Sequence, residues 1–335
     1  MSDNVNIDLV SRTNGKLMGG GDVAMRLLAN NFNANALRTN DTLRKDEWKV
    51  YDTALIAVAR SRLNGIADLM SRGLTFSLPN ALGITRVEWE TATELTGADI
   101  TMSGISQSQN DRMEFDLSGI PVPIIHKDFN LNIRALEASR RTGQPLDTMQ
   151  VERATRRVVE AAESMLFNGY TGLGSNNTIY GYQNAANRNT GTSTGSHDWD
   201  TDSTGSEMLT DVLSMIDKLV ADNMYGPYGL YVTNTAFVRM GDDFKTNSDK
   251  SILQRLLEVP NLEFIKPSPY VGAKQQVMVQ LTRDVVDMID GIQPMMVEWD
   301  SHGGFVKNFK VLAIMVPRVR NDAELQSGIA HFTGA

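Results

Sequence analysis

Three groups of residues in this chain have types and spacing that could do chemistry. The first is Ser193, in the pentapeptide GTSTG at 191–195, which matches the pattern of a nucleophilic serine on a strand-to-helix turn. That mechanism needs a buried strand before the serine and a helix directly after it. The flanking residues are instead polar and of low complexity. The sequence therefore predicts an ordinary loop here and no catalytic serine.

The second group is the run Asp198, Asp200 and Asp202, whose spacing is that of the first half of a calcium-binding loop. An EF-hand also needs Gly at its sixth position and a bidentate Glu at its twelfth, and this chain has Ser203 and Leu209 there. An EF-hand is therefore excluded. The main interpretation is an acidic, solvated loop, and a looser surface calcium site is the alternative.

The third group is the four histidines, none of which is at metal-ligand spacing from another. They are His126, His197, His302 and His331. The chain has no cysteine, which excludes disulfides, thiolate catalysis and cysteine-based metal sites. Phosphate-binding glycine loops are also missing, because the glycines at 169–174 follow an expected helix instead of preceding one. We therefore expect no catalytic residue, no resident metal and no cofactor, and we predict that the chain is not an enzyme.

Charge and hydropathy narrow the class of protein further. The formal charge of −8 over 335 residues argues against a dedicated nucleic-acid binder, which shows a basic patch or stripe. Arg153, Arg156 and Arg157 do lie close together, and we interpret them as a solvated helix face balanced by neighbouring glutamates. No apolar run is long enough to cross a membrane, so we expect no membrane partner. Residues 1–12 lack the features of a signal peptide, so we expect synthesis inside the cell.

The element that must organise the fold is a long helix within 145–169. Asp147 and Gln150 have the spacing of a capping box, and Gly169 stands where a left-handed C-cap is expected. Apolar residues recur at helical spacing and predict one buried stripe. They are Val151, Ala154, Val158, Ala161, Ala162 and Met165. The polar face is expected to carry Glu152, Arg153, Arg156, Arg157, Glu160 and Glu163.

Other elements follow from changes in period along the chain. Residues 1–41 are polar and read as an arm, and 43–64 predicts a helix that Gly65 ends. The segments 84–95 and 112–124 alternate, which predicts a long two-stranded ribbon leaning on another subunit. Residues 169–205 are rich in Gly, Asn, Ser and Thr and predict an exposed insertion.

A second domain is expected to begin at residue 206. The pattern predicts an amphipathic helix at 206–223 and a buried strand at 228–233. Short helices and further strands are expected after it, at 234–242, 251–257, 262–266, 275–281 and 284–289. The apolar strands at 306–320 and 327–332 are expected to return to the long helix and close the first domain.

The order of these segments, together with local sequence, resembles the Hong Kong 97-type family, which comprises tailed-phage major capsid proteins and encapsulin shell proteins. The stretches that carry the resemblance are 43–69, 119–169, 223–240 and 265–271. The resemblance spans 43–333 and is closest to the encapsulin branch. It implies an α+β fold of the Hong Kong 97 type, with an amino-terminal arm, an extended loop, a peripheral domain and an axial domain.

The resemblance also assigns a place in the fold to each segment. The expected division is an arm at 1–42, the first helix and its connection at 43–83, the extended loop at 84–125, the peripheral domain at 126–205 with its spine helix at 148–168, the axial domain at 206–305, and strands returning to the peripheral domain at 306–335. The ribbon would reach over a neighbouring subunit.

The function implied is that of a major capsid protein which self-assembles into the icosahedral shell of a tailed double-stranded DNA bacteriophage. The alternative is the shell of an encapsulin nanocompartment that encloses a cargo enzyme. The implied partners are copies of the chain in pentamers and hexamers and packaged double-stranded DNA held non-specifically. A scaffolding protein, a portal and a decoration protein are further candidates. The implied location is the virion, after synthesis in the host cytoplasm.

Two departures from the family pattern carry expectations. The namesake of the family cross-links its subunits through a lysine in the extended loop, but residues 84–125 contain no lysine. That cross-link is therefore not expected. Only a short arm precedes the folded part, so any scaffold is expected to be a separate protein.

Overall fold

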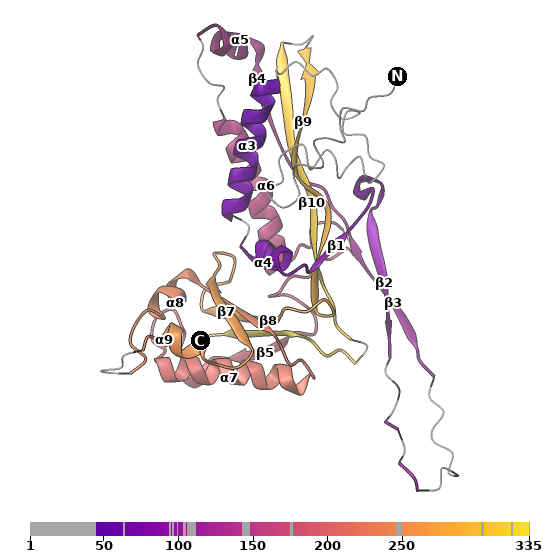
Figure 1. Cartoon of the computed structure of the whole chain (residues 1–335), viewed down its shortest axis with the longest axis vertical. Helices are drawn as coiled ribbons and strands as arrows, with labels where there is room; N and C mark the ends of the chain where they lie inside the picture. The colour runs from indigo at the N-terminus through magenta and orange to yellow at the C-terminus, as the bar shows by residue number, and fades with distance from the viewer. Residues whose placement is uncertain are drawn as a thin grey trace, which may run out of the picture.

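The computed structural model describes residues 45–334, apart from 63, 94, 96, 99, 103, 104, 106–111, 143–147, 175, 176, 246–249, 303, 304 and 323. The expected arm at 1–42 lies outside this range. The described part contains a four-stranded sheet, a five-stranded sheet and a two-stranded ribbon that projects away from both (Figure 1). This mixture of helices and sheets confirms the predicted α+β class.

The bounds of the elements follow the periodicity of the sequence closely. The α-helices are α3 (Lys45–Arg62), α4 (Gly65–Ser71), α5 (Ile133–Thr142), α6 (Met149–Asn168), α7 (Gly205–Ala221), α8 (Asn234–Arg239) and α9 (Ile252–Leu257), with single 3₁₀ turns η2 (Ala81–Gly83) and η3 (Thr194–Ser196). The strands are β1 (Thr75–Ser77), β2 (Arg86–Ala92), β3 (Phe115–Pro121), β4 (Ile125–Asn132), β5 (Asn189–Thr192), β6 (Tyr228–Val232), β7 (Leu262–Pro267), β8 (Gln275–Gln280), β9 (Val286–Ser301), β10 (Val306–Val319) and β11 (Ile329–Thr333).

The long sheet has the strand order β1-β9-β10-β4, and its centre is the antiparallel pair of β9 and β10. Helices α3 and α6 lie together against one face of it (Figure 1). The main core cluster fills the space between them, with Tyr51 of α3, Val158 of α6 and Phe309 of β10 all fully or nearly fully buried. The predicted return of the 306–320 strand to the long helix is thus confirmed.

Helix α6 begins at Met149 with Thr148 as its N-cap, and the side chain of Thr148 accepts no capping hydrogen bond. The expected partner Asp147 lies outside the described residues. At the other end Gly169 is the C-cap as predicted, with a positive φ of 67° and an N–H that bonds to the carbonyl of Met165, but its ψ of −167° lies outside the left-handed helical region. A side chain there would place its Cβ 2.3 Å from the carbonyl oxygen of Ile179, so only glycine fits.

The buried stripe of α6 is wider than predicted and is rotated. Ala161 is exposed, whereas Thr155, Val159 and Leu166 are buried. Glu163 was expected on the polar face but is 1% exposed. Helix α6 is covered by both α3 and α4 as well as by the sheet, so more of its circumference faces protein than one sheet would cover.

The expectation that Gly65 ends the first helix is wrong. Helix α3 ends at Arg62, and Gly65 is the first residue of α4. Its N–H donates to Oε1 of Glu163 at 2.5 Å, and the N–H of Ile66 donates to Oε2 at 3.2 Å. The Glu163 carboxylate therefore caps α4 from another helix, where a local side chain would normally do so. A Cβ at Gly65 would lie 2.9 Å from Cδ2 of Leu166, so the close approach of the two helices requires glycine.

The smaller sheet has the order β5-β11-β8-β6-β7, and α7, α8 and α9 pack on one face of it. Helix α7 begins with a complete capping box, Thr204 and Glu207. Two sequence expectations are wrong here. Strand β11 joins this sheet beside β8 and β5, so residues 327–332 do not return to the long helix. A strand is present where one was expected at 284–289, as the start of β9, but it belongs to the long sheet and not to the second domain in which it was expected.

The expected exposed insertion at 169–205 is also wrong. Ile179, Tyr182 and Trp199 are at most 1% exposed, and residues 189–192 form β5 of the smaller sheet. The segment is polar in composition, but a few large side chains anchor it. Composition averages over residues, whereas burial is decided by the few that carry apolar area.

Candidate functional site

The ribbon of β2 and β3 confirms the predicted two-stranded excursion, and its two faces differ. Val87 and its cross-strand partner Ile120 are buried against the body of the protein. The opposite side, which we call the outer face, carries Glu88, Glu90, Phe115 and Leu117. Phe115 is 67% exposed and Leu117 is 59% exposed. Two large apolar side chains held in the open on a projecting ribbon mark a contact surface.

Exposed apolar side chains continue along the ribbon towards its tip. Ile100, Met102 and Ile105 are between 87% and 107% exposed. They lie between the two alternating segments, at 96–110, and part of this connection lies outside the described residues. Figure 1 shows that the ribbon of β2 and β3 runs away from both sheets.

The root of the ribbon is fixed by Arg318 of β10. Its side chain is only 4% exposed, and its Nε donates to Oδ1 of Asp287 at 2.8 Å, with Nη2 donating to the other carboxylate oxygen at 2.5 Å. The guanidinium lies over two aromatic rings, 4.8 Å from the centroid of Phe76 and 5.4 Å from that of Trp89. This stack joins β1, β2, β9 and β10.

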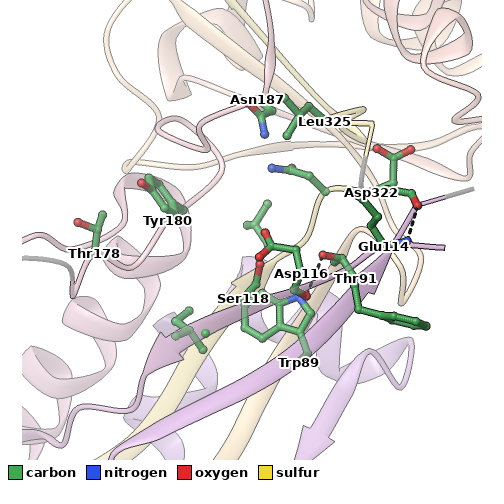
Figure 2. A pocket seen from close by; sticks show the side chains of 16 residues that line it. Trp89, Thr91, Glu114, Asp116, Ser118, Thr178, Tyr180, Asn187, Asp322 and Leu325 are labelled. Carbon is green, nitrogen blue, oxygen red and sulfur yellow. Dashed lines mark hydrogen bonds between the residues drawn. The ribbon is translucent and has the colours of Figure 1, made fainter. Parts of the chain in front are cut away.

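A cavity of about 590 Å³ lies where the ribbon meets the body (Figure 2). Trp89 and Asp116 come from the ribbon, Tyr180 and Asn187 from the segment before β5, and Leu325 from the connection between β10 and β11. Its charged lining residues are the acids Glu114, Asp116 and Asp322. The cavity places three separate stretches of chain around the base of the ribbon.

A partly buried polar cluster joins the smaller sheet to α4. The hydroxyl of Tyr231, in the smaller sheet, donates to Oδ2 of Asp68 at 3.0 Å, and Nζ of Lys266 pairs with the other oxygen. Glu163 lies beside the cluster, and burial is the main cause that raises its pKa to about 7, with the charge of Asp68 adding to the shift and backbone N–H bonds opposing it. The carboxyl with the raised pKa is thus the one that joins α6 to α4, next to this cluster.

The residues first singled out for chemistry are all committed to structural contacts. Ser193 is 4% exposed, and its Oγ accepts a hydrogen bond from Nε2 of Gln276 at 2.8 Å. Oδ1 of Asp198 accepts from the N–H of Thr201 at 2.7 Å, and its Oδ2 lies 3.2 Å from Nζ of Lys274. The group that contacts this hydroxyl is an amide, which cannot act as the general base that a nucleophilic serine needs.

The other two aspartates of the run turn to different neighbours. Asp200 accepts from the N–H of Lys274 at 2.8 Å and from the hydroxyl of Thr233. Asp202 accepts from the N–H of Asp198 at 2.9 Å and pairs with Nδ1 of His197 at 2.9 Å. Their carboxylates tie the loop down. Across the described residues, no group of three or more His, Cys, Asp or Glu side chains is arranged to hold a metal ion.

The four histidines lie at separate places in the fold. His126 is in β4, His302 follows β9, and His331 is in β11. The hydrogen bond to Asp202 raises the pKa of His197. His331 is 6% exposed, and burial, helped by the charge of Arg188, lowers its pKa to about 4.

Three important residues were missed at the sequence level: Glu163, Asp211 and Arg318. Asp211 is 1% exposed; it accepts from Nε1 of Trp199 at 2.7 Å and from the N–H of Thr194 at 2.7 Å, which locks residues 194–199 onto α7. Its position between Met208 and Val212 on the apolar stripe was the available signal. A charged residue on a buried stripe needs a partner, and Glu163 falls in the same kind of position.

The comparisons with known proteins can now be set against this geometry. The profile of DUF6260, described as a family of unknown function, matches residues 33–332. The chain belongs to the DUF6260 family. Among curated proteins, the DUF6260 chain is similar to the type 1 encapsulin shell protein EncA of Myxococcus xanthus (strain DK1622), with 24% identity over 194 residues. That match covers 57% of the chain and 61% of EncA.

Solved structures show the fold of this DUF6260 protein. The virus-like particle of Pyrococcus furiosus aligns with a TM-score of 0.60 and 15% identity, covering 86% of this chain and 98% of that one. The capsid of Myoviridae phage XM1 aligns with a TM-score of 0.63 and 13% identity, covering 79% of this chain and 91% of that one. The predicted Hong Kong 97-type fold is therefore confirmed. Shell proteins, not enzymes, are what the DUF6260 chain is similar to.

For this DUF6260 protein, no helix among the described residues is both long and apolar enough to cross a membrane.

Proposed function

We propose that this protein is the shell subunit of an icosahedral particle, and specifically the major capsid protein of a tailed double-stranded DNA bacteriophage. The observation that carries the proposal is the outer face of the ribbon. Phe115 and Leu117 are exposed on an element that projects from the rest of the chain. Their apolar surface is covered if the ribbon lies on a second copy.

A contact of this kind is heterologous, since the ribbon of one copy covers a different surface of the next. Heterologous contacts close into rings when the rotation fits, which is how pentamers and hexamers arise. In this arrangement the long sheet with α6 is the peripheral domain. The sheet built from β5, β6, β7, β8 and β11 is the axial domain at the ring centre.

The rigid root of the ribbon suits this role. Arg318 and Asp287 hold Trp89 against the body, so the direction of the ribbon is set before assembly. Pre-setting the direction lowers the entropic cost of each inter-subunit contact. The strength of the shell then comes from many repeated contacts.

The long ribbon of β2 and β3 favours a capsid over a nanocompartment. The encapsulin nanocompartment with an enclosed cargo enzyme is the second candidate, because the chain is similar to the encapsulin shell protein EncA. For a capsid, the enclosed partner is double-stranded DNA, and scaffolding, portal and decoration proteins are further partners. The location is the virion, after synthesis in the host cytoplasm.

The first test is the particle size distribution of the chain expressed alone, measured by electron microscopy. Free capsomers, or large and irregular shells, support a capsid protein. Small uniform shells with protein inside support the nanocompartment. Monomers alone, under every condition tried, contradict both.

The second test removes the outer face. Phe115→Ser with Leu117→Ser is expected to abolish particles while leaving the melting temperature of the unassembled chain unchanged, because both side chains are exposed. Val50→Ser on α3, also an exposed apolar residue at 44%, is the matched control and is expected to assemble. Deleting residues 97–110 is expected to weaken assembly in the same way. Normal particles from the double variant would show that the ribbon is not an inter-subunit contact.

A further inference from the structure

A basic groove of about 510 Å³ lies between β4 and α6. Four cations line it, Lys127 from β4 and Arg153, Arg156 and Arg157 from α6. The one carboxylate in the lining, Asp128, is 3.6 Å from Nζ of Lys310 on the neighbouring strand. The protein as a whole has a formal charge of −8, so the charge of this groove is opposite in sign to that of the whole chain.

The position of the groove follows from the sheet order. β4 is the terminal strand of the long sheet, so one edge of it is open within the described part of the chain. In the pairing of β4 with β10, Lys127 lies opposite Val311 and Phe129 lies opposite Phe309. The side chains of Phe129, Phe309 and Val311 pack in the core on the side of the sheet that α6 covers. Lys127 therefore stands on the same side of the sheet as the arginines of α6.

The arginines are available for a ligand. Arg156 is 50% exposed and Arg157 is 74% exposed, and both contact the same carboxylate, Glu160. Arg153 and Arg157 are one helical turn apart, about 6 Å along the axis. A row of exposed cations at this spacing presents several donors to successive negative groups on one strand of a polymer.

We propose that this groove binds the phosphate backbone of duplex DNA. The inference rests on the proposed function, in which the particle encloses DNA, and it turns this face of the sheet towards the enclosed space. Of the residues that line the groove only Phe129 and Ala154 are apolar, and the others are charged or carry an amide, whereas protein partners are held by apolar and aromatic anchors. DNA backbone needs only charge, and binding of that kind has no sequence preference.

A site with so few phosphate contacts binds DNA with low affinity. Neutralising about three phosphates gives a slope of log K against log salt of about −3, or about a 60-fold loss of affinity between 50 and 200 mM salt. Contacts of this strength position packed DNA against the wall and still release it. The acidic remainder of the surface keeps DNA from adhering elsewhere.

The experiment is a titration of the unassembled full-length chain with a short, fluorescein-labelled DNA duplex, followed by anisotropy across a range of salt concentrations. The groove variant is Lys127→Gln, Arg153→Gln and Arg157→Gln, which leaves Arg156 paired with Glu160. The matched control is Lys245→Gln, Lys250→Gln and Arg255→Gln, which removes the same charge from the α9 side of the smaller sheet. The wild type and the control are expected to show the slope of about −3. The groove variant is expected to lose most of it.

A charge-conserving variant, Arg153→Lys with Arg157→Lys, is expected to keep the wild-type slope, which separates loss of charge from loss of fold. Absence of duplex binding by the wild type at low salt, or equal loss in the groove and control variants, would overturn the proposal. So would tighter, groove-dependent binding of polyglutamate than of DNA, which would assign the surface to an acidic protein segment. Particle formation by the same variants, seen in electron microscopy, reports on the proposed function separately.

Discussion

The guanidinium of Arg318 lies 5.4 Å from the ring centroid of Trp89, and this pair fixes where the ribbon leaves the body. Arg318 is in β10 and Trp89 is in β2, so the contact joins the long sheet to the projecting element. Asp287 holds the guanidinium in place from the far side, through two hydrogen bonds. The direction of the ribbon is thus set by a buried, planar, charge-assisted arrangement.

Replacing Arg318 with Met is expected to lower the free energy of unfolding by about 3–5 kcal/mol, because Asp287 is left buried without its main partner. Arg318→Lys is also expected to destabilise, since lysine keeps the charge but loses the planar fork and the stacking on the rings. Urea denaturation of the unassembled chain measures both effects. Arg320→Met is the matched control, because Arg320 pairs with the same carboxylate at 2.7 Å but is 27% exposed. Equal losses from Arg318→Met and Arg320→Met would show that burial of the pair is unimportant.

Glu163 predicts a pH dependence of stability. Its pKa in the folded chain is raised from 4.5 to about 7, so between those values the folded state binds more protons than the unfolded state. The contribution of Glu163 is therefore fully present below about pH 4.5 and is lost as the pH rises through 7, up to about 3 kcal/mol.

Glu163→Gln is expected to remove this dependence, because the amide does not ionise. The measurement is the difference in unfolding free energy between wild type and variant at a series of pH values from 4.5 to 8. A constant difference across that range would show that Glu163 does not titrate there. Glu160→Gln, also on α6 but more exposed, is the control for loss of a carboxylate.

His331 predicts a pH dependence of stability that is opposite in sign to that of Glu163. Its pKa in the folded chain is lowered from 6.5 to about 4, so its contribution is fully present above about pH 6.5 and is lost as the pH falls towards 4. Arg188 donates from Nε to Nδ1 of His331 at 3.1 Å, which requires the neutral ring. His331→Gln is expected to flatten the acid limb of the stability profile, measured by thermal unfolding. His126→Gln, at an exposed position in β4, is expected to leave the limb unchanged.

Asp211 is expected to be needed for the fold of residues 194–199. Asp211→Ala leaves the buried Nε1 of Trp199 and the N–H of Thr194 without an acceptor, which costs about 1–3 kcal/mol for each unsatisfied group. Asp217→Ala, on the exposed side of the same helix, is expected to stay within about 0.5 kcal/mol of wild type. Chemical denaturation followed by tryptophan fluorescence checks both. A loss of stability no larger than that of Asp217→Ala would mean that the loop does not depend on this carboxylate.

The contacts of the run Asp198–Asp202 and of Ser193 reverse what is expected when these residues are replaced. At the sequence level, replacing these residues with Ala is expected to leave assembly unchanged, because the segment reads as a solvated loop. The contacts with Lys274, Thr233 and Gln276 make them structural ties between that segment and the smaller sheet. Their replacement is therefore expected to destabilise this sheet, with no catalytic activity involved.

Local periodicity was sufficient to predict most of the elements. The helices at 149–168 and 205–221, the ribbon strands and the buried strand at 228–232 repeat their apolar residues at intervals that depend only on backbone geometry. The Gly169 cap was predictable for the same reason, since a positive φ is a local property. The order of these elements was also enough to show the resemblance to the Hong Kong 97-type fold.

Pairings between distant parts of the chain were decided by the tertiary structure. The sequence alone did not show that β9 belongs to the long sheet, that β11 belongs to the smaller one, or that Glu163 caps α4 from 98 residues away. A strand pattern specifies an apolar face but not the neighbour that covers it, and a buried charge is recognisable only once its partner is known. The sequence by itself determined the elements, their order and their apolar faces. The tertiary structure decided which faces meet, because burial and hydrogen bonding depend on what another part of the chain brings to the same place.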